Sequence, residues 1–312
     1  MDAIRTFRRN HPVIFSLAAV VVCAAIGLYG FGTIYSLTAQ PFVETARMDD
    51  GLNTIFSDGA LAIVAIAILF LTGRAAVITR KGKGFFKGLL LGLPILCIQI
   101  LLLFFMINMA IAIIEDSLPA GYAEAAEAFG TPMFDFASVV VIFSYLLVGL
   151  GEELVSRGIV AQTLLERFGT GRAGIWKAIV ISSIVFGLTH SMNIVSGMIP
   201  EVAIMQAIKT IFLGMFLCAV YFRTGNIWVV AFLHAFNDIQ ASTATWLFQS
   251  TFVESMNGAA ADISISSMGT TLLFPILYLC LSLFLLRKSK LGEVQKNWEP
   301  ELSTWQAEKD AA

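Results

Sequence analysis

The feature that most constrains the fold is a series of long apolar segments. Hydrophobic residues make up 57% of the 312 residues and charged residues 13%, against about 45–50% and about 25% in soluble proteins. Crossing a bilayer as a helix takes about 20 apolar residues, and about eight segments meet that condition. They cover residues 13–37, 60–77, 88–114, a span beginning near 132, 175 to beyond 190, 202–222, 227–248 and 270–286. We therefore predict an all-α fold, a polytopic membrane protein with about eight transmembrane helices around a polar cavity.

The chain divides into one large domain and a short tail. The first apolar run is longer than the about 7–15 residues of a signal-peptide core, so we expect a retained anchor. We assign residues 1–290 to one transmembrane domain, with a core at 132–250 that carries the polar motifs described below. Arg287, Lys288 and Lys290 then open a segment with little apolar content. Residues 291–312 are predicted to be a polar cytoplasmic tail, frayed or partly helical.

The basic residues predict the orientation. Nearly all Lys and Arg in the loops fall on the side of the N-terminus, with Arg47 and Lys209 as the exceptions. An even number of spans and the positive-inside rule then place both termini in the cytoplasm. The short loops favour a bacterial cell membrane as the location. The net charge of −2 gives no electrostatic reason to expect a nucleic-acid partner.

Two adjacent carboxylates stand inside the fourth apolar segment. Glu152 and Glu153 follow a long apolar run, and Arg157 comes one helical turn after Glu153. A charge inside an apolar span costs at least a few kcal/mol, so such groups face a cavity or a partner. Residues four apart share a helix face, which predicts an ion pair between Glu153 and Arg157. Glu152 points about 100° away and is free to face the cavity.

Two histidines complete the set of intramembrane polar groups. His190 and His234 lie in later apolar segments, and each taken alone could be a hydrogen-bonded residue between helices. At the helical rise per residue, Glu153 lies about 21 Å from Arg167 along its helix. His190 lies about 20 Å from Lys177, and His234 about 16 Å from Arg223, on the same rise. These three basic residues mark the cytoplasmic edge of the segments. Because the depths agree, we predict that the three helices bring these side chains to one shared, water-filled cavity.

These groups suit the hydrolysis of a peptide bond. A desolvated glutamate can act as a general base toward water, and a histidine can transfer the proton to the leaving amine. Hydrogen-bond donors can stabilise the developing oxyanion. Glu152, His190 and His234 are also ordinary zinc ligands, and their spacing does not decide between a Zn²⁺ site and a metal-free reaction. The His-Glu-x-x-His and Gly-x-Ser-x-Gly motifs are both absent from the chain.

Two other functions are compatible with the same residues. A non-catalytic immunity or scaffold protein could use this fold to bind a partner in the membrane. A proton-coupled transporter could use the carboxylates and histidines as a relay. Transporters often contain inverted repeats, and no clear repeat is visible in this sequence.

The motifs resemble those of the CPBP (Abi) intramembrane proteases, which are related to the CAAX prenyl endopeptidase. Glu-Glu-x-x-x-Arg stands at 152–157, Phe-x-x-x-His at 186–190 and His-x-x-x-Asp at 234–238. The resemblance implies a membrane protease whose cavity opens to the cytoplasm and whose substrate is a membrane-associated peptide or protein. It implies Glu152 as the base that activates water and His190 as its catalytic partner. It further implies that His234 and Asp238 stabilise the oxyanion or bind metal.

The supporting residues follow from the same motifs, with one departure. Phe186 lies one helical turn from His190 and is expected to pack against its ring. Asp238 stands where the prenyl proteases use Asn, and an ionised Asp cannot donate a hydrogen bond to an oxyanion. Asp238 must therefore be protonated, orient His234 or bind metal. Asn237 is adjacent but points about 100° away.

Overall fold

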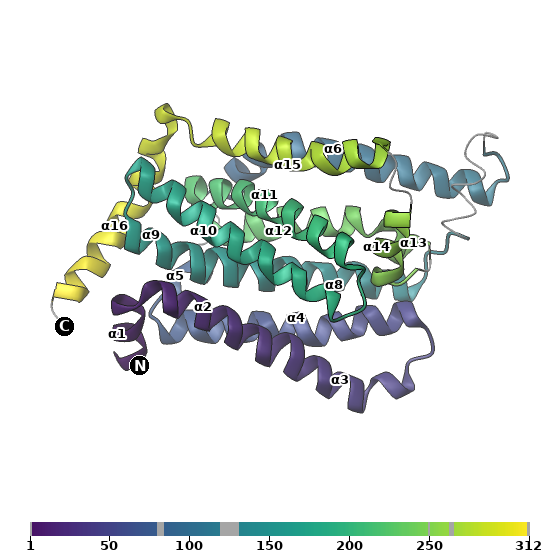
Figure 1. Ribbon diagram of the computed structural model, residues 1–312, viewed down its shortest axis with the longest axis horizontal. Coiled ribbons are helices and arrows are strands. Elements are labelled where there is room, and N and C mark those ends of the chain that lie inside the picture. Colours follow the sequence, from purple (N-terminus) through teal and green to yellow (C-terminus); the bar gives the residue numbers. More distant parts are fainter. Residues whose placement is uncertain (1, 80–83, 119–130, 249, 262–264, 311–312) are drawn as a thin grey trace.

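The structure is a computed structural model that describes residues 2–79, 84–118, 131–248, 250–261 and 265–310. Within those residues the regular elements are all helices, and most of them run along the long axis of the molecule (Figure 1). The first half comprises α1 Asp2–Asn10, α2 Pro12–Cys23, η1 Ala24–Phe31, α3 Gly32–Thr38, η2 Gln40–Phe42, α4 Ala46–Leu71, α5 Ala76–Thr79 and α6 Phe85–Ile114. The middle comprises α8 Phe136–Glu153, η4 Leu154–Ala161, α9 Gln162–Phe168, α10 Arg172–His190 and η5 Ser191–Ile194. The last part comprises α11 Pro200–Thr224, α12 Ile227–Ala241, α13 Thr243–Leu247, α14 Phe252–Ala261, α15 Ile265–Leu285, η6 Lys288–Lys290 and α16 Leu291–Asp310.

The all-α membrane fold is confirmed, but the predicted count of about eight spans is not. Six helices of the described chain are long and apolar enough to cross a membrane, or seven if the bent pair formed by α15 and α16 counts as one. The predicted second span extends further back, because α4 begins at Ala46. The predicted span at 227–248 is divided, because α12 ends at Ala241 and α13 starts at Thr243. Residues 119–130, between α6 and α8, lie outside the described residues.

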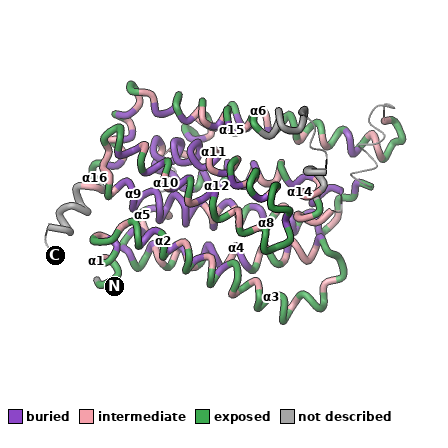
Figure 2. Tube along the Cα trace, in the orientation of Figure 1, coloured by how far each residue is buried: buried purple, intermediate pink, exposed green. Residues whose placement is uncertain are grey.

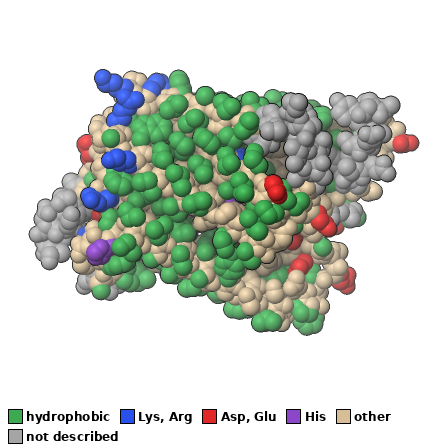
Figure 3. Space-filling view, in the orientation of Figure 1, with side chains coloured by type: hydrophobic (Ala, Val, Ile, Leu, Met, Phe, Trp, Pro, Cys, Tyr) green, Lys and Arg blue, Asp and Glu red, His purple; other side chains and the backbone are tan. Residues whose placement is uncertain are grey.

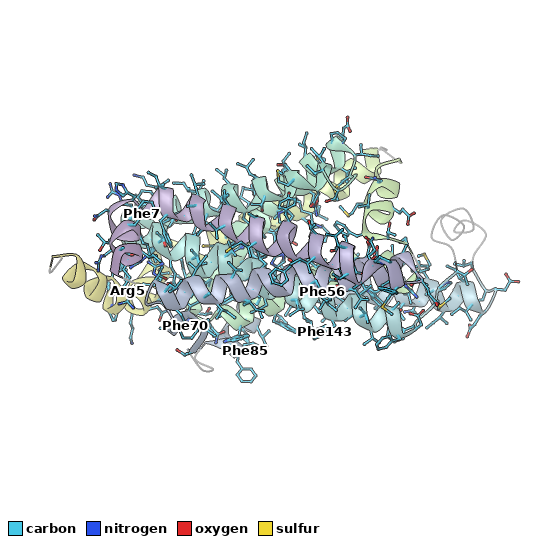
Figure 4. All side chains as sticks on the ribbon, turned by 90° about the horizontal axis from the view of Figure 1, so that it is seen from below. Arg5, Phe7, Phe56, Phe70, Phe85 and Phe143 are labelled. Atoms are coloured by element: carbon cyan, nitrogen blue, oxygen red, sulfur yellow. The ribbon has the colours of Figure 1, made fainter. Side chains whose placement is uncertain are left out.

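The outer surface is apolar over most of its length. Leu90, Phe104 and Phe86 are 72%, 65% and 81% exposed, as expected for side chains that contact lipid. Figure 2 shows buried residues concentrated in the central helices and exposed ones on α2, α3 and α6. Figure 4 shows Phe56, Phe70 and Phe143 on the face that carries α4. The exposed apolar side chains therefore form the continuous surface that a bilayer requires.

Charged side chains separate toward the two ends of the molecule. On the face in Figure 3, Lys and Arg gather at one end and most Asp and Glu at the other. The first and last described residues both lie at the basic end (Figure 1). Arg47, an exception to the charge pattern, is 5% exposed and pairs with Asp135 at 2.6 Å. Asp135 also caps α8 by accepting a hydrogen bond from the Ser138 backbone N–H. The Arg47 guanidinium is therefore paired inside the protein with a carboxylate that the helix start holds in place.

The segment expected to be a frayed or partly helical tail begins with a packed helix. Trp298 on α16 is fully buried between the rings of Tyr221 and Phe222, and its indole N–H donates to the Phe222 carbonyl at 2.8 Å. Leu291 and Val294 are buried beside it. The tryptophan therefore anchors the start of α16 to the basic end of α11.

Glu293 on α16 holds three cations at this end of the bundle. Its carboxylate lies 2.8 Å from Lys87, 2.6 Å from Arg223 and 2.9 Å from Lys290. Burial raises the pKa of Glu293, but the hydrogen bonds from these three side chains outweigh burial and lower it to about 2. Because the folded-state pKa lies below the ordinary 4.5, this cluster stabilises the fold fully above pH 4.5 and loses that effect as the pH falls toward 2.

We expect Glu293→Gln to lower the melting temperature near neutral pH by an amount equivalent to about 1 kcal/mol or less. The difference from the wild type should shrink as the pH falls below 4.5, because the wild-type carboxylate then takes up a proton. Thermal unfolding in detergent, from neutral pH to below pH 4.5, measures this difference in melting temperature. Glu299→Gln, an exposed site on the same helix, is the matched control. A difference that stays constant with pH would contradict the assignment.

Candidate active site

Glu152 and Glu153 are the last residues of α8, where the helix changes its winding. The next eight residues form the π-helix η4, and all of them are buried. Segments of π-helix are rare and are frequent at functional sites. The change of winding begins directly after the two glutamates.

Glycine allows α12 to approach the glutamates closely. A Cβ on Gly149 would lie 2.6 Å from the Ala231 carbonyl oxygen and 2.8 Å from the Ala235 Cβ, so a larger residue would push α12 away. The α12 helix follows a tight turn at Gly225, whose φ is +65°, and Asn226 caps its start. The turn and the close contact together place His234 beside the end of α8.

Glu153 links Arg157 to His234. Its Oε1 accepts a hydrogen bond from Arg157 at 2.8 Å, the pair that the helical spacing predicts. The same oxygen lies 3.0 Å from His234 Nδ1. Arg157 also donates to the Gly214 carbonyl at 3.0 Å. Because a carboxylate only accepts, His234 presents an Nδ1–H to Glu153, which fixes the orientation of its ring.

Phe186 packs between the two histidines. Its ring centroid lies 5.0 Å from that of His190 and 5.6 Å from that of His234, edge to face in both cases. His190 Nδ1 lies 3.0 Å from the Phe186 carbonyl oxygen, which can only accept. In the neutral His190 ring, the proton is therefore on Nδ1 and the lone pair on Nε2. The Phe186–His190 contact expected from the spacing is present, and the ring also supports His234.

Glu152 faces both histidines across a gap. Its Oε2 lies 3.6 Å from His234 Nε2 and 3.8 Å from His190 Nε2, distances longer than a direct hydrogen bond. The oxygen is buried and has no hydrogen-bond partner. A water molecule placed between these three atoms would satisfy the oxygen and one nitrogen of each ring.

A cavity of about 60 Å³ adjoins Glu152. That volume holds several water molecules at about 10–15 Å³ each. Its walls are mainly apolar side chains of α2, η1 and α4 on one side and of η4 and α10 on the other, with Ser156, Ser182 and Thr189 as polar members. The larger polar cavity open to the cytoplasm stays a prediction.

Asp238 and Asn237 lie on the other side of His234. Asp238 Oδ2 is 3.3 Å from His234 Nε2. Asn237 donates from Nδ2 to Asp238 Oδ1 at 3.0 Å. The structure therefore gathers every residue predicted for the site: Glu152, Glu153, Arg157, Phe186, His190, His234, Asn237 and Asp238.

Sequence reasoning missed Asp58 on α4, a third carboxyl close to the site. Asp58 is 8% exposed, and its backbone oxygen would lie 3.1 Å from a Cβ placed on Gly151. Its carboxyl group interacts electrostatically with Glu152, Asp238 and His234. Depth in the membrane could have identified it. At the helical rise per residue, Asp58 lies about 24 Å from Arg74, close to the depth of Glu153.

Whether Zn²⁺ binds at this site stays a prediction. A carboxylate oxygen and two ring nitrogens are suitable ligands for the ion, with bonds of about 2.0–2.2 Å. In the described part of the chain, no three His, Cys, Asp or Glu side chains are arranged to hold a metal ion.

The fold and site define a helical membrane protein with a carboxylate–histidine cluster inside its apolar layer. Residues 134–240 match the family model described as Type II CAAX prenyl endopeptidase Rce1-like. This match covers about a third of the chain, including all three motifs, and confirms the resemblance to CAAX-type intramembrane proteases. No curated protein and no solved structure matches the chain.

Proposed function

We propose that the chain is an intramembrane endopeptidase that hydrolyses a peptide bond in a membrane-associated peptide or protein. The observation that carries this proposal is the Glu152 oxygen, buried without a partner and 3.6 and 3.8 Å from two histidine nitrogens. The basic end of the molecule supports an orientation with both termini in the cytoplasm. The bacterial cell membrane is the proposed location.

Glu152 acts as the general base in this proposal. Its carboxylate takes a proton from the water bound between Oε2 and the two rings, and the water oxygen forms a bond to the substrate carbonyl carbon. The carbon–nitrogen bond of the tetrahedral intermediate then breaks, and the proton on Glu152 passes to the leaving amine. Most of the cavity wall is apolar, which strengthens these electrostatic interactions.

The histidines have separate roles. His190 Nε2 carries the lone pair in the neutral ring, so it accepts the second hydrogen bond of the water and positions it. His234, held by Glu153 through Nδ1, directs Nε2 toward the reacting carbonyl and donates to the oxyanion when Nε2 is protonated. This assignment uses Asp238 to orient and stabilise His234, not as a donor to the oxyanion.

The test is cleavage in proteoliposomes. Purified protein should release fragments from a membrane-anchored peptide labelled at both ends, with Glu152→Gln inactive. A wild-type protein that leaves every such peptide intact but conducts protons in a Glu152-dependent manner would overturn the endopeptidase and support a transporter. Full protection of a host by Glu152→Gln and His190→Ala variants would support the non-catalytic immunity protein.

A Zn²⁺ ion held by Glu152, His190 and His234 is the alternative proposal, and chelation separates the two. We expect cleavage to persist at its full rate after incubation with EDTA and with 1,10-phenanthroline, because in the proposed reaction Glu152 activates the water without a metal. Elemental analysis of the same sample should give less than stoichiometric zinc. Loss of activity on chelation, restored by Zn²⁺, together with zinc that disappears in His190→Ala would establish a metalloenzyme.

A further inference from the structure

A buried hydrogen-bond network supports Asp238 from two helices outside the family match. Gln99 on α6 and Tyr278 on α15 are 1% and 0% exposed. Gln99 Nε2 and Tyr278 Oη each donate to Asn237 Oδ1, both at 3.0 Å. Asn237 itself is 6% exposed and donates from Nδ2 to Asp238 Oδ1 at 3.0 Å. Two distant segments of the chain thus converge on a residue next to the site.

The network determines which way the Asn237 amide points. Two donors on Oδ1 occupy both of its lone pairs and turn the Nδ2 group toward Asp238. Rotating the Asn237 amide by half a turn would place its oxygen against the Asp238 carboxyl group and would require the Gln99 amide and the Tyr278 hydroxyl to turn as well. The hydroxyl of Tyr278 and the amide of Gln99 therefore hold Asn237 as a donor to Asp238.

An Asp238 that accepts from Asn237 has its second oxygen available for His234. Its Oδ2 lies 3.3 Å from His234 Nε2. The hydrogen bond from Asn237 to Oδ1 therefore fixes which oxygen of Asp238 faces the His234 ring.

We propose that Gln99 and Tyr278 are positioning residues for the reaction, acting through Asn237 to hold the Asp238 carboxyl group in place beside His234. The inference rests on the proposed endopeptidase function and extends its machinery to α6 and α15. It also accounts for Asp at position 238, because an acceptor there serves His234 directly. Neither residue touches the reacting atoms; each acts through Asn237 and Asp238, so the expected effect is on kcat.

The test is a double-mutant cycle on the cleavage reaction. Tyr278→Phe removes one hydroxyl donor without changing ring size, and we expect kcat to fall about fivefold, the effect of one hydrogen bond, with KM unchanged. In an Asp238→Ala background, measured under single-turnover conditions, Tyr278→Phe should have no further effect, because the group it positions is gone. Gln99→Met should behave in the same way.

Controls separate positioning from general stability. Tyr221→Phe removes a buried hydroxyl that bonds Gln162 near the anchored end of α11, and it should leave kcat within twofold of the wild type. The inference would be overturned if the losses of kcat from Tyr278→Phe and Asp238→Ala multiplied in the double variant, or if KM rose at constant kcat. Either result would leave the proposed endopeptidase function in place. Absence of any Glu152-dependent cleavage would overturn both.

Discussion

Glu152→Gln is expected to lower kcat for peptide cleavage by about 10²–10⁴-fold, the range that a positioned general base contributes. The amide has the shape of the carboxyl group but cannot accept the proton of the attacking water. The change should not harm the fold, because Glu152 Oε2 has no hydrogen-bond partner to lose. Removing one negative charge near Asp58, Glu153 and Asp238 should leave the melting temperature unchanged or raise it.

Single-turnover cleavage in proteoliposomes measures the loss of activity, and thermal unfolding in detergent measures the melting temperature. Glu201→Gln, a change of the same type at an exposed position on the first turn of α11, is the matched control and should keep full activity. A Glu152→Gln protein that cleaves at more than half the wild-type rate would remove the general-base role. A variant that fails to fold would show that Glu152 stabilises the bundle instead.

Local spacing predicted the contacts that lie within one helix. The Glu153–Arg157 pair and the Phe186–His190 contact both join residues four apart, and both are present. Helical rise also predicted that Glu152, His190 and His234 would reach the same depth. Depth does not specify which faces of two helices meet. For this reason the contact of Glu153 with His234, which depends on the close approach at Gly149, could not be predicted from spacing.

Residues far from the motifs were harder to identify. Gln99 and Tyr278 each stand alone in an apolar stretch, and Asp58 follows Ser57 in a mixed segment; single polar residues in a membrane helix often have no catalytic role. Their importance depends on packing between helices that are distant in the chain. The anchored tail was missed although Leu291, Val294 and Trp298 stand at helical spacing, because three apolar residues give a weak signal in an otherwise polar segment.

The largest effect on stability is expected for Arg157→Met. Glu153 is 0% exposed, and this change would leave its carboxylate buried without its arginine partner. Breaking a buried pair by removing one partner typically costs about 3–5 kcal/mol. Arg157 also donates to the Gly214 carbonyl and lies 4.5 Å over the Phe186 ring, so α11 and α10 lose contacts as well. Unfolding in mixed detergent measures the loss, with Lys177→Met at an exposed position as the control.

The double variant Glu153→Gln, Arg157→Met distinguishes the two roles of Glu153. It removes both charges, so much of the lost stability should return, since replacing both partners of a buried pair is far less costly than removing one. Cleavage by the double variant should stay below the wild-type rate, because a neutral amide holds the His234 ring less firmly than a carboxylate does. Recovery of stability and cleavage together would mean that Glu153 serves only to neutralise Arg157. Recovery of stability alone would assign Glu153 a second role, that of orienting the histidine on α12.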